Sequence, residues 1–263
     1  MHKPLHTLLL LLSILLLCIG LSACGNGQNQ TVATVGQSKI SRATLNHWMS
    51  TVAGGDYHQI LGKRAPAGLA SEPADYPRCV KAAERIVAQA EASHRPHFSH
   101  AQLQTKCRQL YTALKEQALG YLIAVLWRAE EGRELGANVS DREIDQRVNE
   151  IRRTEYANPA QFDRYLAERN WTIGDERYLL KRNMLDDKFL ARLKAQVARQ
   201  GGGQQTLIKL IRQAFAKLSA KTSCSPGYRA WGCKQYGLAE AVKPSPAQLI
   251  EYLAGTNAEP AQG

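Results

Sequence analysis

Residues 195–207 read AQVARQGGGQQTL, where three consecutive glycines separate two segments that each have a helical pattern. In the segment before the glycines, 171–198, apolar residues recur at helical spacing among charged ones. The apolar stripe of the segment after them consists of Leu207, Leu210, Ile211, Ala214, Phe215 and Leu218. Glycine adopts a left-handed backbone without steric cost, so it commonly ends a helix. We therefore predict that 201–205 form a short turn joining two helices of one core.

Upstream of the glycines, the sequence predicts one strand hairpin and a series of helices. TVATVGQSKI (31–40) alternates apolar and polar residues around Gly36, which is typical of two short strands. Ser41 can cap the next helix. The apolar face of that helix is Leu45, Trp48, Met49 and Val52. The following 53–77 is rich in Gly and Pro, so we predict a loop there, although Ile60 and Leu61 can dock.

Capping patterns mark the later helices. One helix is predicted from about Pro77, and a break at HRPHFSH (94–100) precedes the longest helix, which opens at Ser99 or His100 and ends near Gly136. Three further helix starts carry capping residues. These are Ser140 with Glu143, Asn158 with Pro159, and Thr172 with Asp175.

The first 24 residues predict export. Lys3 precedes the apolar run 8–24, which is short for a membrane span. Its end, LSAC (21–24), resembles the lipobox of bacterial lipoproteins, in which the cysteine is acylated. We therefore expect lipidation of Cys24, followed by a flexible tether in 24–30. The alternative is a secreted protein with an ordinary cleavage site.

The cysteine count agrees with export. Of six cysteines, Cys18 lies in the leader and Cys24 is the expected lipidation site. An even remainder of four favours two disulfides, for which three pairings are possible. We predict the nearest-neighbour pairing, because each such pair flanks a local chain reversal. The pairs are Cys79 with Cys107 and Cys224 with Cys233. A structural zinc site is disfavoured because short C-x₂-C spacings are absent.

The chain is basic, with 34 Lys and Arg against 23 Asp and Glu and a net charge of +11. For an exported protein this charge favours anionic lipid headgroups, wall polymers or acidic client segments over nucleic acid. A basic, solvated surface without a specific partner is the alternative interpretation.

Three segments in order carry a family resemblance: VATVGQSKISRATLNHW (32–48), VSDREIDQRVNEI (139–151) and FDRYLAERNWTIGDERYLLKRNMLDDKF (162–189). Together they resemble the N-terminal chaperone domain of SurA/PrsA-type extracytoplasmic foldases, over residues 31 to about 198. The paired cysteines and AKTSCSPGYRAWGC (220–233) look most like the actinobacterial branch. The resemblance implies a mainly α, helical-bundle fold with a short N-terminal hairpin and a C-terminal return helix.

The chain also differs from this family in the segment before its last helix. Full-length members carry a parvulin peptidyl-prolyl isomerase domain before the final helix. Here the short 201–205 stands in that place, and no histidine follows Trp171. Sequence patterns of serine hydrolases, P-loop proteins and HExxH zinc enzymes are absent as well. We expect no catalytic residues and no cofactor; isomerase activity by family membership remains an alternative.

Large apolar side chains are the candidates for client binding, although most of them are expected to fill the core. The candidates are Trp48, Met49, Trp127, Phe162, Tyr165, Met184, Phe189 and Phe215. His94, His97 and His100 are weak candidates for binding zinc or copper. Pro96 stiffens their loop, and no carboxylate or free thiol accompanies them at matching spacing, so we expect no functional metal site.

The predicted organisation is therefore a leader (1–23), a tether (24–30), a helical chaperone domain (31–200), the glycine turn (201–205), a return helix with disulfide loop (206–240) and a mostly disordered tail (241–263). The tail can hold a short helix at Gln248–Leu253. We expect a lipid-anchored chaperone on the extracytoplasmic face of the cell membrane that binds unfolded or nascent exported proteins through an apolar groove. An envelope metal-binding or scaffold lipoprotein is the remaining alternative.

Overall fold

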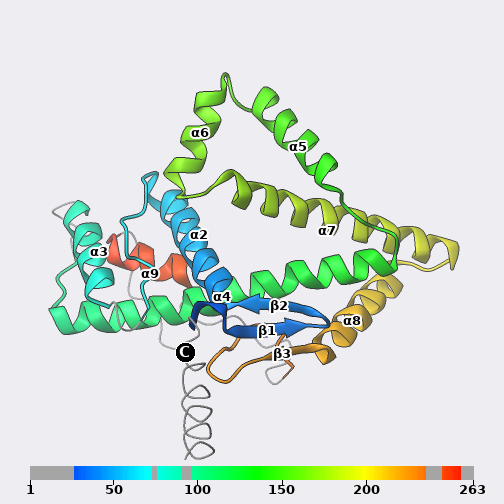
Figure 1. Cartoon of the computed structure of the whole chain (residues 1–263), viewed down its shortest axis with the longest axis horizontal. Helices are drawn as coiled ribbons and strands as arrows, with labels where there is room; N and C mark the ends of the chain where they lie inside the picture. Colours follow the sequence, from blue (N-terminus) through cyan, green and yellow to red (C-terminus); the bar gives the residue numbers. More distant parts are fainter. Residues whose placement is uncertain (1–26, 73–75, 91–95, 235–244, 256–263) are drawn as a thin grey trace, which may run out of the picture.

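The computed structural model describes residues 27–72, 76–90, 96–234 and 245–255. These residues form a mainly helical fold, as the sequence predicts, with a small antiparallel sheet (Figure 1). The predicted leader, the LSAC motif and Cys24 lie outside the described residues. Among the residues that are described, no helix is both long enough and apolar enough to cross a membrane.

The sheet contains the predicted hairpin and one strand that the sequence did not predict. β1 (Thr31–Val35) and β2 (Ser38–Ser41) pair around Gly36, whose φ is 55°. β3 (Thr222–Cys224) comes from the expected disulfide loop and pairs with the other edge of β1, which gives the order β2-β1-β3. The N-terminal hairpin and the disulfide loop, almost 190 residues apart in the sequence, therefore meet in one sheet.

Helix α2 (Arg42–Leu61) begins at the predicted Ser41 cap, whose side chain accepts a hydrogen bond from the Thr44 amide. The prediction of a loop from residue 53 was wrong for its first nine residues, because the helix continues to Leu61 and ends at Gly62. Tyr57, inside the predicted loop, is fully buried. Packing of this side chain outweighs the low helix propensity of the two preceding glycines.

Helix α3 (Tyr76–Gln89) packs against the first part of the long central helix α4 (His100–Glu134) (Figure 1), and both disulfides follow the predicted pairing. Cys79 and Cys107 join α3 to α4 across 28 residues of sequence. Closing a loop of that length restricts the unfolded chain and stabilises the fold by about 3.5 kcal/mol in the chain-entropy account. The start of α4 has a complete Ser99–Gln102 capping box.

Helices α5 (Asp141–Thr154), α6 (Pro159–Glu168) and α7 (Ile173–Arg199) form three sides of a triangle that stands on α4 in Figure 1. All three begin at the predicted caps. They bury a small core of their own, separate from the main one. Its buried members are Ile144, Val148, Ile151, Phe162, Leu166 and Leu180.

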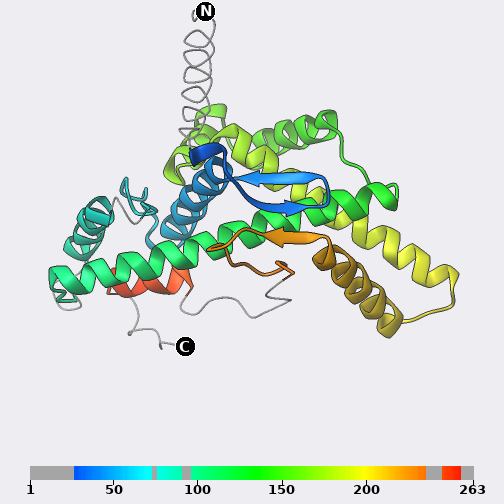
Figure 2. The same cartoon turned by 60° about the horizontal axis from the view of Figure 1, so that its bottom comes forward.

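The glycines join two helices, as predicted. α7 ends with Gly201 at φ 64°, and the Gly202 amide donates to the Val197 carbonyl over 2.9 Å. α8 (Gln204–Ala220) then folds back beside the end of α7 before the chain enters β3 (Figure 2). Only Leu218 of its stripe is fully buried, while the other members are half-buried. The return helix therefore packs on the core mainly through its C-terminal end.

Helix α9 (Pro246–Leu253) contains the short helix expected at Gln248–Leu253, and this helix is part of the main core. The remainder of the predicted tail, apart from residues 245 and 254–255, lies outside the described residues. Leu249, Ile250 and Leu253 are almost inaccessible to solvent and pack against α2 and α4. The amphipathic spacing of these three residues explains the burial, since one face of a short helix can cover two neighbouring helices.

Candidate functional site

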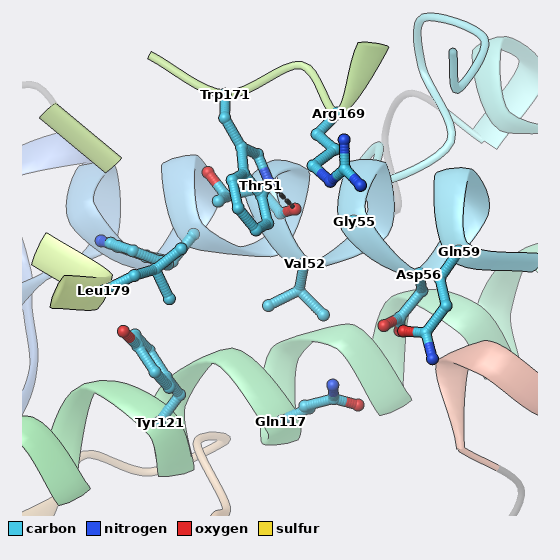
Figure 3. A pocket seen from close by; sticks show the side chains of 11 residues that line it. Thr51, Val52, Gly55, Asp56, Gln59, Gln117, Tyr121, Arg169, Trp171 and Leu179 are labelled. Carbon is cyan, nitrogen blue, oxygen red and sulfur yellow. Dashed lines mark hydrogen bonds between the residues drawn. The ribbon is translucent and has the colours of Figure 1, made fainter. Parts of the chain in front are cut away.

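A pocket lies between α2, α4 and the segment that links α6 to α7 (Figure 3). Its volume is about 370 Å³. Its lining is Trp48, Thr51, Val52, Gly55, Asp56, Gln59, Gln117, Tyr121, Arg169, Trp171 and Leu179. We call this cavity the α2–α4 pocket. In Figure 3, Asp56 and Gln59 lie at the end away from Leu179 and Tyr121.

Two glycines of α2 allow the α6–α7 linker to cross this helix closely. A Cβ atom on Gly54 would lie 2.0 Å from the Arg169 carbonyl oxygen, which no packing adjustment of side chains can relieve. A Cβ atom on Gly55 would lie 3.1 Å from the Trp171 ring. The Trp171 indole nitrogen donates to the Thr51 carbonyl over 2.9 Å. The tight crossing therefore fixes Trp171 as a wall of the α2–α4 pocket.

Polar contacts hold the linker on both sides of that crossing. Asn170 has a left-handed backbone, with φ at 58°, and its side chain accepts a hydrogen bond from the Arg64 Nε at 2.6 Å. On the other side, Asp175 caps α7 by accepting from Thr172 and lies 2.5 Å from the His47 Nε2 of α2. These contacts anchor the start of α7 to α2 and so keep the pocket open between them.

Aromatic rings form the apolar end of the α2–α4 pocket. The Trp48 ring centroid lies 4.9 Å from that of Tyr121 and 4.8 Å from that of Tyr178. The Tyr121 hydroxyl is buried without a hydrogen-bond partner, and burial raises the pKa of this phenol. Burial likewise raises the pKa of Tyr178 to about 12. Both phenols are therefore neutral donors at physiological pH.

Asp56 supplies the charge of the polar end. Its Oδ2 atom is buried and accepts no hydrogen bond, and no ion pair with a described residue neutralises it. Burial alone raises the pKa of this carboxyl from 3.8 to about 6. Near neutral pH the α2–α4 pocket therefore contains a carboxylate whose charge is not compensated by the protein around it.

Arg169, the cation on the pocket's edge, is engaged elsewhere. Its guanidinium carbon lies 3.9 Å from the centroid of the Tyr165 ring, and its Nη1 donates to the Tyr165 carbonyl over 3.1 Å. Its charge also lowers the pKa of Glu176, against the larger raising effect of burial. Asp56 shows no such electrostatic effect from Arg169. The two charges therefore belong to separate parts of the site.

Of the eight apolar candidates for client binding, Trp48 alone lines the α2–α4 pocket. The others are core or half-buried packing residues. Met49, Trp127, Phe162 and Phe189 are buried. Tyr165, Met184 and Phe215 are half-buried against the two cores. The expected contribution of the return helix is also absent from this lining, because α8 packs on the far half of α4 through Phe215 and Trp127.

Sequence reasoning missed Asp56, Gln59, Gln117 and Arg169. The first two lie in the segment taken for a loop, so their position on a helix face was hidden. The Gly54–Gly55 pair was the available signal, since adjacent glycines inside a helix mark a close approach of backbones as well as a break.

Two of the three histidine candidates lie in the described part of the chain. His97 precedes α4, His100 is the first residue of α4, and His94 is outside the described residues. In the part of the chain that is described, no group of three or more His, Cys, Asp or Glu side chains could hold a metal ion.

Comparisons with known proteins give no relative for this chain. No protein-family model matches it, and neither the curated proteins nor the solved structures include a significant match.

Proposed function

We propose that this protein is an extracytoplasmic chaperone that holds unfolded segments of exported polypeptides in the α2–α4 pocket. The observation that carries the proposal is the composition of this pocket. Aromatic and aliphatic walls lie next to the Asp56 carboxylate and the Tyr121 hydroxyl, which have buried oxygen atoms without a hydrogen-bond partner among the described residues. Such a lining suits extended chain segments, which present apolar side chains and unpaired backbone groups together.

The construction of the pocket supports the proposal. Its walls come from elements far apart in the sequence, and a tight backbone crossing and a disulfide-linked core brace them. A preformed cavity binds a flexible chain with less loss of entropy than a collapsing surface would. Gln59 and Gln117, which line the pocket, have exposed side chains, so an extended chain can approach the pocket from solvent on that side.

The proposal extends to the location of the protein. Export and acylation at Cys24 would place the chaperone where newly translocated chains appear, and two disulfides suit an oxidising compartment. Replacing Cys24 with Ala should release the protein from the membrane fraction into the soluble fraction of the producing cell. Retention of this variant in membranes would contradict the lipid anchor.

The experiment that tests the function is suppression of client aggregation. The purified chain without its leader should delay light scattering by a chemically denatured client at near-equimolar ratio. A Val52→Gln/Leu179→Gln variant makes the pocket walls polar at similar volume and should lose most of this effect.

Leu190→Gln is the matched control, because Leu190 is 36% exposed on α7 and does not line the pocket. It should behave as the wild type. Circular dichroism confirms that each variant is folded. Equal losses in both variants, or no activity of the wild type on several clients, would contradict the proposal.

A further inference from the structure

The carboxylate of Asp56 lowers the stability of the fold, because its charge is partly buried and uncompensated by the described residues. A buried carboxylate without a partner normally recruits hydrogen-bond donors or a cation. Asp56 has neither among the described residues, and its Oδ2 is inaccessible to solvent. Asp56 as a whole is only half-buried and lines the α2–α4 pocket, so part of its carboxylate remains accessible to an incoming group.

The neighbours of Asp56 leave room for a cation. Gln59 on α2 and Gln117 on α4, which line the same pocket, are neutral. The Arg169 guanidinium is held by Tyr165. Lys115, the nearest cation to Gln117 along α4, donates to the Gly227 carbonyl over 2.9 Å. Among the described residues, no cation therefore contributes to the electrostatics of Asp56.

The rest of the pocket is suited to an aliphatic stem. Val52, one helical turn before Asp56 on α2, provides apolar contact next to the carboxylate, and Trp48 and Leu179 continue the apolar wall toward the other end of the pocket (Figure 3). Lysine and arginine have this amphipathic character, because a flexible hydrocarbon stem carries a charged tip. Aromatic faces add attraction for a cation that lies over them. A cavity of about 370 Å³ exceeds the volume of one such side chain and leaves space for the backbone that carries it.

We propose that the α2–α4 pocket recognises a protonated lysine or arginine side chain of the bound polypeptide, with its stem against Val52 and its tip on Asp56. This inference rests on the proposed function and specifies its substrate class. It assigns to the chaperone a preference for apolar segments interrupted by a single basic residue.

The test is binding of two fluorescent peptides that are identical except at one central position. One peptide has an apolar extended sequence with a central lysine, and the other has norleucine there, which keeps the stem and lacks the charge. The wild type should bind the lysine peptide about tenfold more tightly, as expected for a charged hydrogen bond formed in a desolvated site. Fluorescence anisotropy at pH 7.5 measures both dissociation constants.

Two variants assign the preference to its residue. Asp56→Asn keeps the shape of the side chain and should bring the two dissociation constants within about twofold of each other. Asp187→Asn removes the same charge from an exposed position on α7 and should keep the tenfold preference. A preference that survives Asp56→Asn, or that Asp187→Asn also abolishes, overturns the inference.

The remaining outcomes separate the inference from the proposed function. Equal binding of both peptides by the wild type overturns the cation preference and leaves the chaperone proposal intact. Failure to bind either peptide, together with no effect on client aggregation, overturns both. A competition experiment with butylamine tests whether a small amine is sufficient. If millimolar butylamine displaces the fluorescent peptide as effectively as the unlabelled lysine peptide does, the site binds a free amine instead of a polypeptide, and the inference is overturned.

Discussion

Replacing Asp56 with Asn should make the protein more stable near neutral pH. In the folded chain, burial raises the pKa of this carboxyl from 3.8 to about 6. A folded-state pKa above the unfolded value means that the folded protein binds more protons between these two pH values. Stability therefore rises as the pH falls from about 6 to 3.8, and the full cost of the charge is present above pH 6.

The magnitude follows from the size of that shift. One pKa unit corresponds to 1.36 kcal/mol, so a shift of about two units costs the fold up to about 3 kcal/mol at pH 7.5. Asparagine removes the charge but leaves a buried amide with few partners, which offsets about 1 kcal/mol of the gain. The net expectation is a free energy of unfolding higher by about 1–2 kcal/mol.

Urea unfolding followed by circular dichroism at 222 nm, with the disulfides intact, measures this gain at pH 7.5 and at pH 4.0. The difference between Asp56→Asn and the wild type should shrink toward zero at pH 4.0, where Asp56 is protonated when folded. A variant that is less stable than the wild type at pH 7.5 would refute the reasoning, because it would show that the carboxylate has a stabilising partner. A gain independent of pH would refute it as well.

Three further predictions concern contacts that stabilise the fold around the pocket, and urea unfolding measures the change in the free energy of unfolding for each of them. Gly54→Ala should lower the free energy of unfolding by about 3 kcal/mol, because the added Cβ meets the Arg169 carbonyl. Gly174→Ala is the comparison on α7, where the added Cβ makes only ordinary contact, and it should raise the free energy of unfolding by about 0.5–1 kcal/mol. Similar effects of the two substitutions would contradict the close crossing. Replacing both Cys79 and Cys107 with Ser should lower the free energy of unfolding by about 3.5 kcal/mol. The same change at Cys224 and Cys233, which are 9 residues apart in the sequence, should lower it by about 2.5 kcal/mol. A larger loss for the Cys224–Cys233 pair would contradict the loop-closure account. Trp127→Phe removes the 2.8 Å hydrogen bond from the indole to Thr222 and should cost about 1–3 kcal/mol, and an unchanged midpoint would mean that this buried bond contributes nothing.

The helical framework was largely predictable from local chemistry. Ser140 and Thr172 form capping boxes at the predicted positions, and Asn158 caps the helix that begins at Pro159. Gly201 ends α7 as expected for a left-handed residue. These features depend on a few neighbouring residues, so the sequence contains all the information that they require.

The candidate site depended on long-range packing, which local patterns do not contain. Gly54 reads as a helix breaker until the Arg169 backbone, 115 positions later, is placed against it. Thr222 looked like part of a loop because the edge of β1 that it pairs with lies almost 190 residues earlier. Asp56 belongs to no sequence motif. It stands out only because the fold brings no described hydrogen-bond donor or cation to its buried Oδ2 atom.

Site-specific photo-crosslinking tests the central claim most directly. A benzoylphenylalanine placed at Gln59, on the accessible rim of the α2–α4 pocket, should form abundant crosslinks to an unfolded client under conditions in which the same probe at Leu190 gives only background. The account predicts that an excess of the unlabelled lysine peptide abolishes the crosslinks at position 59. Crosslinking at 59 no stronger than at 190, or crosslinks that the peptide does not displace, would contradict the assignment of client binding to this pocket.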